Sequence, residues 1–499
     1  MRLTITDRNP TKVRADVHVA LVWKEDLGKG GIKSDDLRRL DREVRGALST
    51  AIKRGRFKGG SGDQFEGAAT SEKTWVFLGA GKRSDIDARG WLQMGSRAGC
   101  AVLRRRGKSL ALAPRADLET PAARCLAAGV HLGAYRYDEC RGKGTKPEQR
   151  LPALGALTLC AEGDGIREAV GAGDALGEAL TLARNLVNAP SNFLTPTAMA
   201  TRARAWGKEC GFAVQVIGKR ELEKMGCGGI LAVNRGSNEP PCLIVMKHRP
   251  KRTAKASLAL VGKGVTFDTG GISIKPAANM HHMKGDMGGA AAVIAAMGAI
   301  ARLDLPIEVT GLVPSTENMP DADAVKPGDV ITHLNGKTVE ILNTDAEGRL
   351  ILADALVHAC REFKPSHLVD FATLTGACVV ALGEQIAGVM SNDDKFRVHL
   401  CDAAERAGES LWPLPLNQEF RRQLKSDVAD LANVAGSRWG GAETAAAFLQ
   451  EFVDGPKWCH IDIAGPAFAS APHGAYLAKG GTGFGVLTAV AVAEELARA

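Results

Sequence analysis

The chain has 499 residues and a formal net charge of +8, and 45% of its residues are hydrophobic and 24% charged, which is typical of globular proteins and excludes disordered and fibrous classes. This length exceeds what one hydrophobic core usually serves, so we expect two domains. No apolar run is long enough to span a bilayer, no secretory signal is visible, and the eleven cysteines lack a Cys-x-x-Cys pair, which together predict a cytoplasmic protein without a membrane partner.

The first section of the chain alternates strand-like and helix-like patterns. Residues 15–23 and 74–78 are rich in Val and aromatic side chains and are expected to form strands, as are residues 157–160. Residues 34–54 carry leucine and valine at helical spacing. A long amphipathic pattern over residues 166–188 then predicts a helix that links two domains.

The second section contains short apolar runs separated by helical stretches, which is typical of a sheet buried on both faces. The runs occupy residues 214–217, 230–233, 243–246, 258–261, 309–313 and 368–371. We therefore predict an α/β fold with a smaller N-terminal α/β domain over residues 1–165 and a larger C-terminal α/β domain over residues 166–499. The larger domain is expected to have a mixed, doubly wound central sheet.

The densest cluster of unusual polar residues follows the run at 258–261. This Gly-rich segment offers Lys263, Asp268, Lys275 and Asp286. Open α/β sheets bind their ligands just beyond the carboxyl ends of their strands, so this position favours a functional site.

A second cluster contains Asp345, Glu347 and Arg349 and precedes an apolar helical stretch. Taken alone, it is explained by helix capping, with Thr344 or Asp345 as the cap and Glu347 as an acid favoured in the first turn. Together, the two Gly-rich segments bring three Asp, one Glu, two Lys and one Arg, which favours a metal site.

Carboxylate ligands suit Mn²⁺, Mg²⁺ or Zn²⁺, and the cluster has enough acids to bridge two such ions. A metal pair lowers the pKa of a bridging water and polarises a carbonyl, while nearby cationic side chains stabilise an oxyanion. The spaced Gly-Lys-Ser/Thr pattern of a phosphate-binding loop and the Gly-x-Ser-x-Gly elbow of serine hydrolases are absent. His281 and His282 lack the His-Glu-x-x-His frame, so we do not expect them to be ligands.

At these residues the chain closely resembles the leucyl aminopeptidase family, also called cytosol aminopeptidases (peptidase family M17). The octapeptide Asn-Thr-Asp-Ala-Glu-Gly-Arg-Leu is the signature of that family, and further motifs match in order from about Ala183 to the C-terminus. These matches lie at residues 188–196, 261–264, 266–268, 270–276, 284–292, 343–350, 372–376, 412–416, 424–426 and 461–465.

The resemblance implies two divalent metal ions per subunit, Mn²⁺ or Zn²⁺, held by Lys263, Asp268, Asp286, Asp345 and Glu347. The tighter site resembles one formed by the Lys263 amine, Asp268, Asp286 and Glu347. The more exchangeable site resembles one formed by Asp268, Asp345 and Glu347. A lysine ligand must be neutral, so the ions would have to depress its pKa far below the usual value.

The resemblance also assigns roles around the metals. Lys275 is similar to the residue that polarises the scissile carbonyl, and Arg349 is similar to the one that holds a bicarbonate ion as general base. The free α-amine of the substrate would bind a metal and Asp286. The implied substrate-binding residues are Met283, Thr373, Leu374, Gly376, Ala464 and Ala467, although core packing alone also explains Met283.

The predicted function is therefore a two-metal aminopeptidase that removes Leu or another apolar residue from the amino end of peptides and aminoacyl amides. The resemblance implies a homohexamer, with the N-terminal domain serving assembly or regulation. His281 and His282 stand where relatives often carry acids, which predicts altered metal preference or pH dependence. Two rivals stay open: a two-metal phosphoesterase, and DNA binding as an added role of the basic stretches near Arg38 and Arg104.

Overall fold

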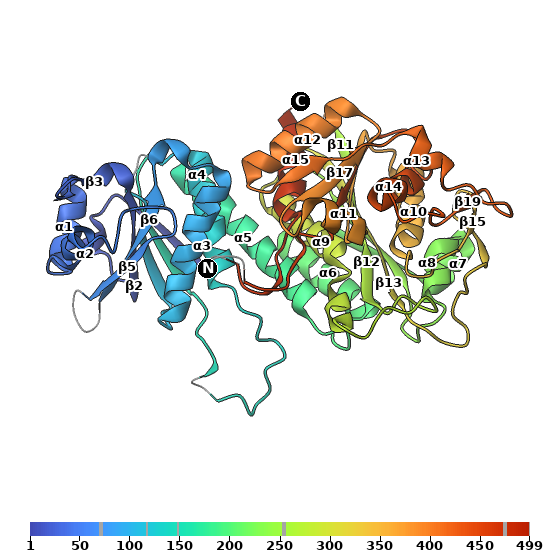
Figure 1. Cartoon of the computed structure of the whole chain (residues 1–499), viewed down its shortest axis with the longest axis horizontal. Helices are drawn as coiled ribbons and strands as arrows, with labels where there is room; N and C mark the ends of the chain where they lie inside the picture. The colour runs from blue at the N-terminus through green and yellow to red at the C-terminus, as the bar shows by residue number, and fades with distance from the viewer. Residues whose placement is uncertain (69–72, 116–117, 147–148, 252–255, 473–476, 499) are drawn as a thin grey trace. The chain divides into compact units, whose positions relative to one another are not determined.

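The computed structural model describes residues 1–68, 73–115, 118–146, 149–251, 256–472 and 477–498. The chain divides into two compact units, the first formed mainly by Met1–Thr181 and the second by Leu182–Ser470 and Lys479–Ala499. Each unit is built from helices and strands, and the second is the larger, so the two-domain α/β prediction is confirmed (Figure 1). The division falls inside helix α5 (Ile166–Asn188).

The first unit contains a six-stranded sheet in the order β1-β8-β7-β2-β6-β5. Neighbouring strands are parallel except at β5, which runs antiparallel to β6. The strands are β1 (Arg2–Thr6), β2 (Val17–Trp23), β5 (Gln64–Ala68), β6 (Thr74–Gly81), β7 (Ser109–Ala113) and β8 (Ala156–Cys160), with a short hairpin of β3 (Leu27–Gly28) and β4 (Gly31–Ile32).

Helices cover both faces of this sheet. Val19 and Leu21 of β2 pack with α3 (Ala88–Arg104) and α4 (Thr120–Ala134). Ala20 and Val22 point to the other face and pack with α1 (Asp35–Glu43) and α2 (Ala47–Lys53). This alternation is what a strand buried on both faces requires.

The single helix predicted over residues 34–54 is wrong, because the segment forms two helices. Ser34 caps α1 by accepting a hydrogen bond from the Leu37 amide. The chain then leaves the helical conformation at Arg45 and Gly46, whose φ angles are 55° and 76°. Leucines at helical spacing continue through the break, so the periodicity alone does not reveal it.

Helices α3 and α4 pack with their backbones in direct contact through four glycines. A Cβ atom on Gly95 or Gly99 of α3 would collide with carbonyl oxygens of α4, and one on Gly129 or Gly133 would collide with those of α3. Since the obstacles are backbone atoms, no side-chain rotation can relieve such a collision.

Gly133→Ala should therefore destabilise the first unit by about 3 kcal/mol or more, at the upper end of overpacking costs. The expected signs are faster amide hydrogen exchange in α3 and α4 and a lower first thermal transition. Gly171→Ala in α5 is the matched control, because no atom lies within 4 Å of the added Cβ. Unchanged exchange in Gly133→Ala would contradict this packing.

The second unit is organised around a nine-stranded sheet. Eight strands follow the order β18-β17-β20-β16-β11-β13-β10-β9, and β12 pairs with β13. The sheet is mixed, as predicted, with β11, β13, β16 and β20 parallel and β10 antiparallel to both of its neighbours. The strands are β9 (Ala213–Gly218), β10 (Cys242–His248), β11 (Ser257–Gly262), β12 (Gly264–Asp268), β13 (Glu308–Asn318), β16 (His367–Ala372), β17 (Ala387–Ser391), β18 (Leu411–Pro413) and β20 (Lys457–Asp462).

Smaller strands and helices complete this unit. Two minor sheets contain β14 (Val330–Thr332), β15 (Thr338–Glu340) and β19 (Leu431–Ala432), and β21 (Phe468–Ala469) with β22 (Gly480–Gly481). The helices are α6 (Pro196–Cys210), α7 (Lys219–Met225), α8 (Gly228–Asn234), α9 (Gly288–Arg302), α10 (Gly348–His358), α11 (Gly376–Leu382), α12 (Asp394–Ala407), α13 (Gln418–Arg422), α14 (Gly441–Gln450) and α15 (Val486–Arg498).

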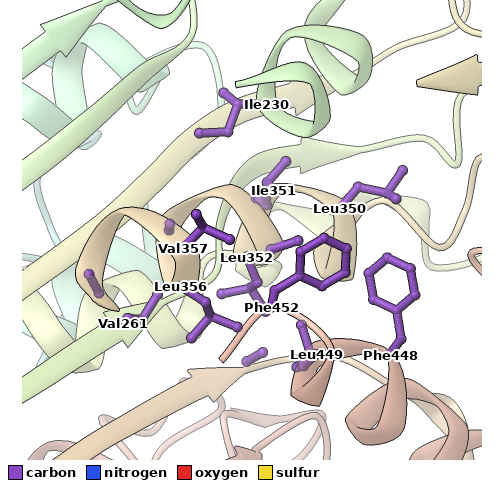
Figure 2. Close-up of a cluster of buried hydrophobic side chains, with 14 of the residues drawn as sticks. Ile230, Val261, Leu350, Ile351, Leu352, Leu356, Val357, Phe448, Leu449 and Phe452 are labelled. Atoms are coloured by element: carbon purple, nitrogen blue, oxygen red, sulfur yellow. The ribbon is translucent and has the colours of Figure 1, made fainter. Parts of the chain in front are cut away.

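A buried apolar cluster holds helix α10 against the sheet. Leu352 and Leu356 of α10 lie among Val261 of β11 and Phe448 and Phe452 at and beyond α14 (Figure 2). Burying a Leu or Phe side chain contributes about 1.5–3 kcal/mol, so this cluster fixes α10 firmly. The loop that leads into α10 carries Asp345 and Glu347, and its position is fixed as a result.

The apolar run at residues 230–233 is not a strand but part of helix α8. Short apolar runs cannot be assigned from periodicity alone, because a buried helix and a buried strand look alike over four residues. The other five runs lie in strands β9, β10, β11, β13 and β16.

All eleven cysteines are free thiols. Among the described residues, no helix combines the length and the apolar character needed to cross a bilayer.

Candidate active site

The two polar clusters converge at the carboxyl ends of the central strands. Lys263 follows β11, and Asp268 is the last residue of β12. Asp286 follows a short 3₁₀ helix (Met280–Gly285), and Glu347 directly precedes α10. Oxygen atoms of Asp268, Asp286 and Glu347 lie within 4.8 Å of one another, and all three residues are buried.

Lys263 lies at the centre of this cluster. Its Nζ is 2.8 Å from Asp286 Oδ1 and 2.8 Å from Glu347 Oε1, and it also donates to the Thr373 carbonyl oxygen. A Cβ atom on Gly348 would overlap the Lys263 side chain, so glycine is needed there for the lysine to pass. The ammonium group thus occupies the centre of a cage of oxygen atoms.

Lys275 contacts the other side of the cluster. Its Nζ is 2.8 Å from Asp268 Oδ2 and forms an ion pair with Asp345. Burial disfavours the ammonium forms of Lys263 and Lys275, but the surrounding carboxylates outweigh it and hold both lysine pKa values above normal. Both side chains are therefore cationic in this arrangement.

The carboxylates are crowded and poorly hydrated. Burial raises the pKa of Asp268 to about 6, and it also raises the pKa values of Asp286 and Asp345. Burial alone would raise the pKa of Glu347 too, but the positive charges of Lys263 and Lys275 outweigh burial and lower this pKa. Like charges held this close in a dry site need cations to compensate them.

The donor set fits divalent cations. Asp286 Oδ1 accepts hydrogen bonds from Lys263 and from the Thr373 hydroxyl, whereas the buried Asp286 Oδ2 has no hydrogen-bond partner among the described residues. A buried carboxylate oxygen without a partner is costly, and metal coordination is one way to satisfy it. Several carboxylates around one point are the ligands that hard divalent ions prefer.

Arg349 is the second residue of α10 and is buried. Its Nη1 donates to the Asn433 carbonyl oxygen at 2.8 Å, while its Nε has no partner among the described residues. Burial lowers the pKa of Arg349 to about 10. A guanidinium with a free N–H in a dry site is suited to hold a small anion.

The alternative that Thr344 or Asp345 caps α10 is wrong. The N-cap residue is Glu347, and no side chain caps this helix end. Thr344 instead donates its hydroxyl to the Gly270 carbonyl oxygen and accepts from the Ser273 amide, which joins the two polar clusters. These polar residues therefore connect the two parts of the site and do not cap the start of α10.

The residues predicted to bind substrate lie on segments around this cluster. Thr373 follows β16 and contacts Asp286, and Ala467 lies with Thr373 near the start of α9. The Leu374 and Ala464 amides both donate to Asp462, at 3.2 and 3.1 Å. The remaining two predicted substrate-binding residues are Met283, in the 3₁₀ helix before Asp286, and Gly376, at the start of α11.

Three polar residues that hold the site together were missed from the sequence. Asn318 ends β13 and donates to Asp268 Oδ1 at 2.8 Å and to the Thr344 carbonyl oxygen. Asn433 accepts from the amides of residues 342 and 343, and Asp462 ends β20. Asp462 was detectable, because it lies in the matched motif at residues 461–465, whereas Asn318 lies beyond the strand predicted at residues 309–313.

His281 and His282 lie in the 3₁₀ helix before Asp286. Their rings are 4.3 Å apart, and the ring of His282 is 5.0 Å from that of Phe468. Burial and the neighbouring His281 lower the pKa of His282. Neither belongs to the buried carboxylate cluster, and their effect on metal preference stays a prediction.

Residues 181–490 match the catalytic domain of the cytosol aminopeptidase family, and residues 19–144 match the N-terminal domain of the same family. A probable cytosol aminopeptidase of Chlorobium luteolum is 51% identical over 379 residues, which cover 73% of this chain and 74% of that protein. Another from Mycobacterium marinum is 49% identical over 381 residues, covering 75% of this chain and 73% of that one.

Two solved structures are similar over nearly their whole lengths. A mutant of tomato leucine aminopeptidase gives a TM-score of 0.89 at 32% identity and covers 99% of this chain and 96% of its own. The bottromycin maturation enzyme BotP in complex with Mn gives a TM-score of 0.84 at 38% identity, covering 97% and 100%.

Proposed function

This chain belongs to the cytosol aminopeptidase family, and we propose that it uses two metal ions to remove leucine or another apolar residue from the amino end of peptides and aminoacyl amides. One observation carries the proposal. Three buried carboxylates from separate segments have ligand atoms within 4.8 Å of one another, and the amine of Lys263 lies 2.8 Å from two of them.

The residues that would hold the ions are Lys263, Asp268, Asp286, Asp345 and Glu347, with Asp268 and Glu347 as bridges. Mn²⁺ and Zn²⁺ are both compatible with this mixture of carboxylates and one amine, and the related BotP was solved with Mn. When bound, the ions would activate a water and polarise the scissile carbonyl. Lys263 would have to give up its proton to act as a ligand.

Lys275 and Arg349 would act on the reacting groups. The Lys275 ammonium, which pairs with Asp268 and Asp345, would stabilise the oxyanion of the tetrahedral intermediate when those carboxylates are engaged as metal ligands. The free N–H of Arg349 supports a bicarbonate ion at this position, which would accept the proton of the attacking water.

Specificity for the amino end would arise at Asp286. Its Oδ2 has no partner among the described residues, and a protonated or metal-bound α-amine would satisfy it. The side chain of the first substrate residue would lie against Met283, Thr373, Gly376, Ala464 and Ala467, which are mostly apolar, and Leu374 would contact the residue beyond the scissile bond. This lining favours leucine and other apolar residues.

The family resemblance also supports a homohexamer and a cytoplasmic location, and the curated relatives are named cytosol aminopeptidases. Analytical ultracentrifugation of the full chain tests the assembly directly. A monomer or dimer at micromolar concentration would contradict the hexamer.

The function is tested by chelating the purified full chain and restoring Mn²⁺ or Zn²⁺ before each assay. Leucine p-nitroanilide should be cleaved only with metal present, and leucine and methionine amides should be preferred over aspartyl and glycyl amides. N-acetyl-leucine p-nitroanilide, which lacks the free amine, and p-nitrophenyl phosphate should remain intact. Metal-independent cleavage, or equal cleavage of the acetylated substrate, would overturn the proposal.

Metal affinity should rise with pH. Without metal, Asp268 has a pKa of about 6 and the pKa values of Asp286 and Lys263 are also raised, so protons compete with the ions. For each proton that the metal displaces, metal binding should become about tenfold tighter for each unit by which the pH rises, as long as the pH is below the pKa of the displaced proton. Calorimetric titration of the chelated protein with Mn²⁺, in buffers of different ionisation enthalpy between pH 5.5 and 8, should show proton release. Affinity independent of pH would contradict this site chemistry.

A further inference from the structure

The first unit contains an open crevice that the aminopeptidase site does not use. It has a volume of about 540 Å³ and lies beyond the carboxyl ends of strands β1, β7 and β8. Its lining comprises Asp7, Arg8, Asn9, Pro10, Asp36, Arg39, Leu40, Arg83, Ala113, Arg115, Cys160, Ala161 and Glu162. This volume falls within the range of small-molecule and cofactor sites.

At β7 the crevice adjoins the point between β2 and β7 where the strand order of the sheet reverses. From β2 the chain moves to β6 on one side, and from β6 it returns to β7 on the other side of β2. The connecting helices correspondingly cover opposite faces, α1 and α2 on one and α3 and α4 on the other. Open α/β sheets bind ligands at such switch points, outside the carboxyl ends of the strands.

One buried arginine is held rigidly at this edge. Arg115 donates to Asp26 Oδ2 at 2.8 Å, to the Ser34 hydroxyl at 2.7 Å and to the Leu21 carbonyl oxygen at 3.2 Å. Its side chain is only 7% exposed, and its Nε has no hydrogen-bond partner among the described residues. Arg115 also belongs to the lining of the crevice, so it places a positively charged side chain, fixed by its bonds to Asp26 and Ser34, at the wall.

The backbone of Arg115 is also unusual, with a φ of 57°. A left-handed conformation at a non-glycine residue is uncommon and is held by its surroundings. Here Arg83 donates to the Arg115 carbonyl oxygen at 3.0 Å, and the Arg83 guanidinium stacks over the ring of Trp23. The guanidinium groups of Arg83 and Arg115 thus both lie against the Asp26 carboxylate, at 3.7 and 2.8 Å.

The remaining charges of the lining are mixed. Arg8 and Arg39 add two exposed guanidinium groups, whereas Asp7, Asp36 and Glu162 add three carboxylates. Carboxylates would repel the phosphates of a nucleic acid backbone, but they accept hydrogen bonds from the hydroxyl groups of a sugar. The combination therefore favours a small molecule with one anionic end and several hydroxyl groups.

We propose that this crevice binds a small phosphorylated sugar or a nucleotide, with its phosphate on the arginines and its hydroxyl groups on the carboxylates. Arginine guanidinium groups match phosphate oxygens in geometry and charge. The site belongs to the first unit alone and does not depend on the proposed peptidase chemistry.

Isothermal titration calorimetry of the full chain with ribose 5-phosphate, ADP and inorganic phosphate tests the proposal. One of the two sugar phosphates should bind at least tenfold more tightly than inorganic phosphate. Arg39→Ala and Arg8→Ala should each weaken that binding about tenfold, and both positions are exposed, so folding should be retained. Arg42→Ala is the matched control, since Arg42 lies exposed on the same helix but outside the lining, and it should keep wild-type affinity.

Glu162→Gln separates the two halves of the proposal. It should weaken binding of the sugar phosphate and leave binding of inorganic phosphate unchanged, because only the sugar supplies hydroxyl donors. No measurable heat with any of the three probes at millimolar concentration would overturn the proposal. Equal affinity for all three probes, or an equal loss in Arg42→Ala and Arg39→Ala, would overturn it as well.

Discussion

Replacing Glu347 with glutamine should reduce kcat/KM for leucine p-nitroanilide by about 1,000-fold or more, which corresponds to about 4 kcal/mol of transition-state stabilisation. The Glu347 side chain is buried, and its carboxylate lies 2.8 Å from Lys263 Nζ. Glutamine keeps the size of the side chain but not its charge, so the site would lose the carboxylate proposed to bridge both ions. Steady-state kinetics and metal analysis on the same samples measure both losses.

Glu405→Gln is the matched control for this variant. Glu405 is exposed on α12 and takes no part in the cluster, so activity and metal content should remain at wild-type values. Thermal unfolding of both variants shows whether folding is retained. Two metals per subunit and full activity in Glu347→Gln would refute the proposed role of this residue.

The local parts of the fold were predictable because they depend on short stretches of sequence. Apolar runs such as 243–246 and 258–261 form central strands, since a sheet covered on both faces requires continuous apolar segments. The errors occur where local pattern is ambiguous. Residues 230–233 form a helix, and the helix expected over residues 34–54 breaks at Arg45 and Gly46, where a change of backbone conformation leaves no mark on the leucine spacing.

The candidate site was predictable where its residues directly follow strands. Lys263 and Asp268 come at the ends of β11 and β12, so the rule for ligand sites in α/β sheets points to them. The partners that fix these side chains were not predictable. Asn318 bonds to Asp268 across 50 positions of sequence, and such pairings depend on the tertiary fold rather than on any local motif.

A similar limit applies to the first unit. Arg115 follows a short strand, and its neighbours along the chain give no sign that it bonds to Asp26 and Ser34, 89 and 81 positions away. The sequence showed only basic stretches there, for which a solvated surface is the simplest explanation. The crevice becomes visible only when the strand order of the sheet is known.

Lys263→Met should destabilise the chelated protein at pH 8 by about 3–5 kcal/mol, the usual cost of leaving a buried charge without its partner. In the metal-free site the Lys263 ammonium lies between Asp286 and Glu347, both buried. Methionine fills a similar volume but supplies no charge, so the two carboxylates would face each other unshielded. Thermal or urea unfolding of the chelated variant and wild type measures the difference.

The same variant should recover part of this stability at pH 5.5. Burial already holds the pKa values of Asp286 and Asp268 above normal, and loss of the lysine raises them further. A carboxyl group whose pKa is higher in the folded state than in the unfolded state stabilises the fold when it takes up a proton. The loss of stability in Lys263→Met relative to wild type should therefore grow as the pH rises through the folded-state pKa of these carboxyl groups.

Lys337→Met provides the comparison for both measurements. Lys337 pairs with Glu451 at 2.7 Å and is about one-third exposed, away from the metal cluster, so its loss should cost about 1 kcal/mol or less at either pH. Lys263→Met should also lose aminopeptidase activity at saturating Mn²⁺, since its amine is a proposed ligand, whereas Lys337→Met should keep it. If the chelated Lys263→Met protein were as stable as wild type at pH 8, the three carboxylates could not be a cluster of ionised groups that needs a cation. The electrostatic argument for the metal site would then fail.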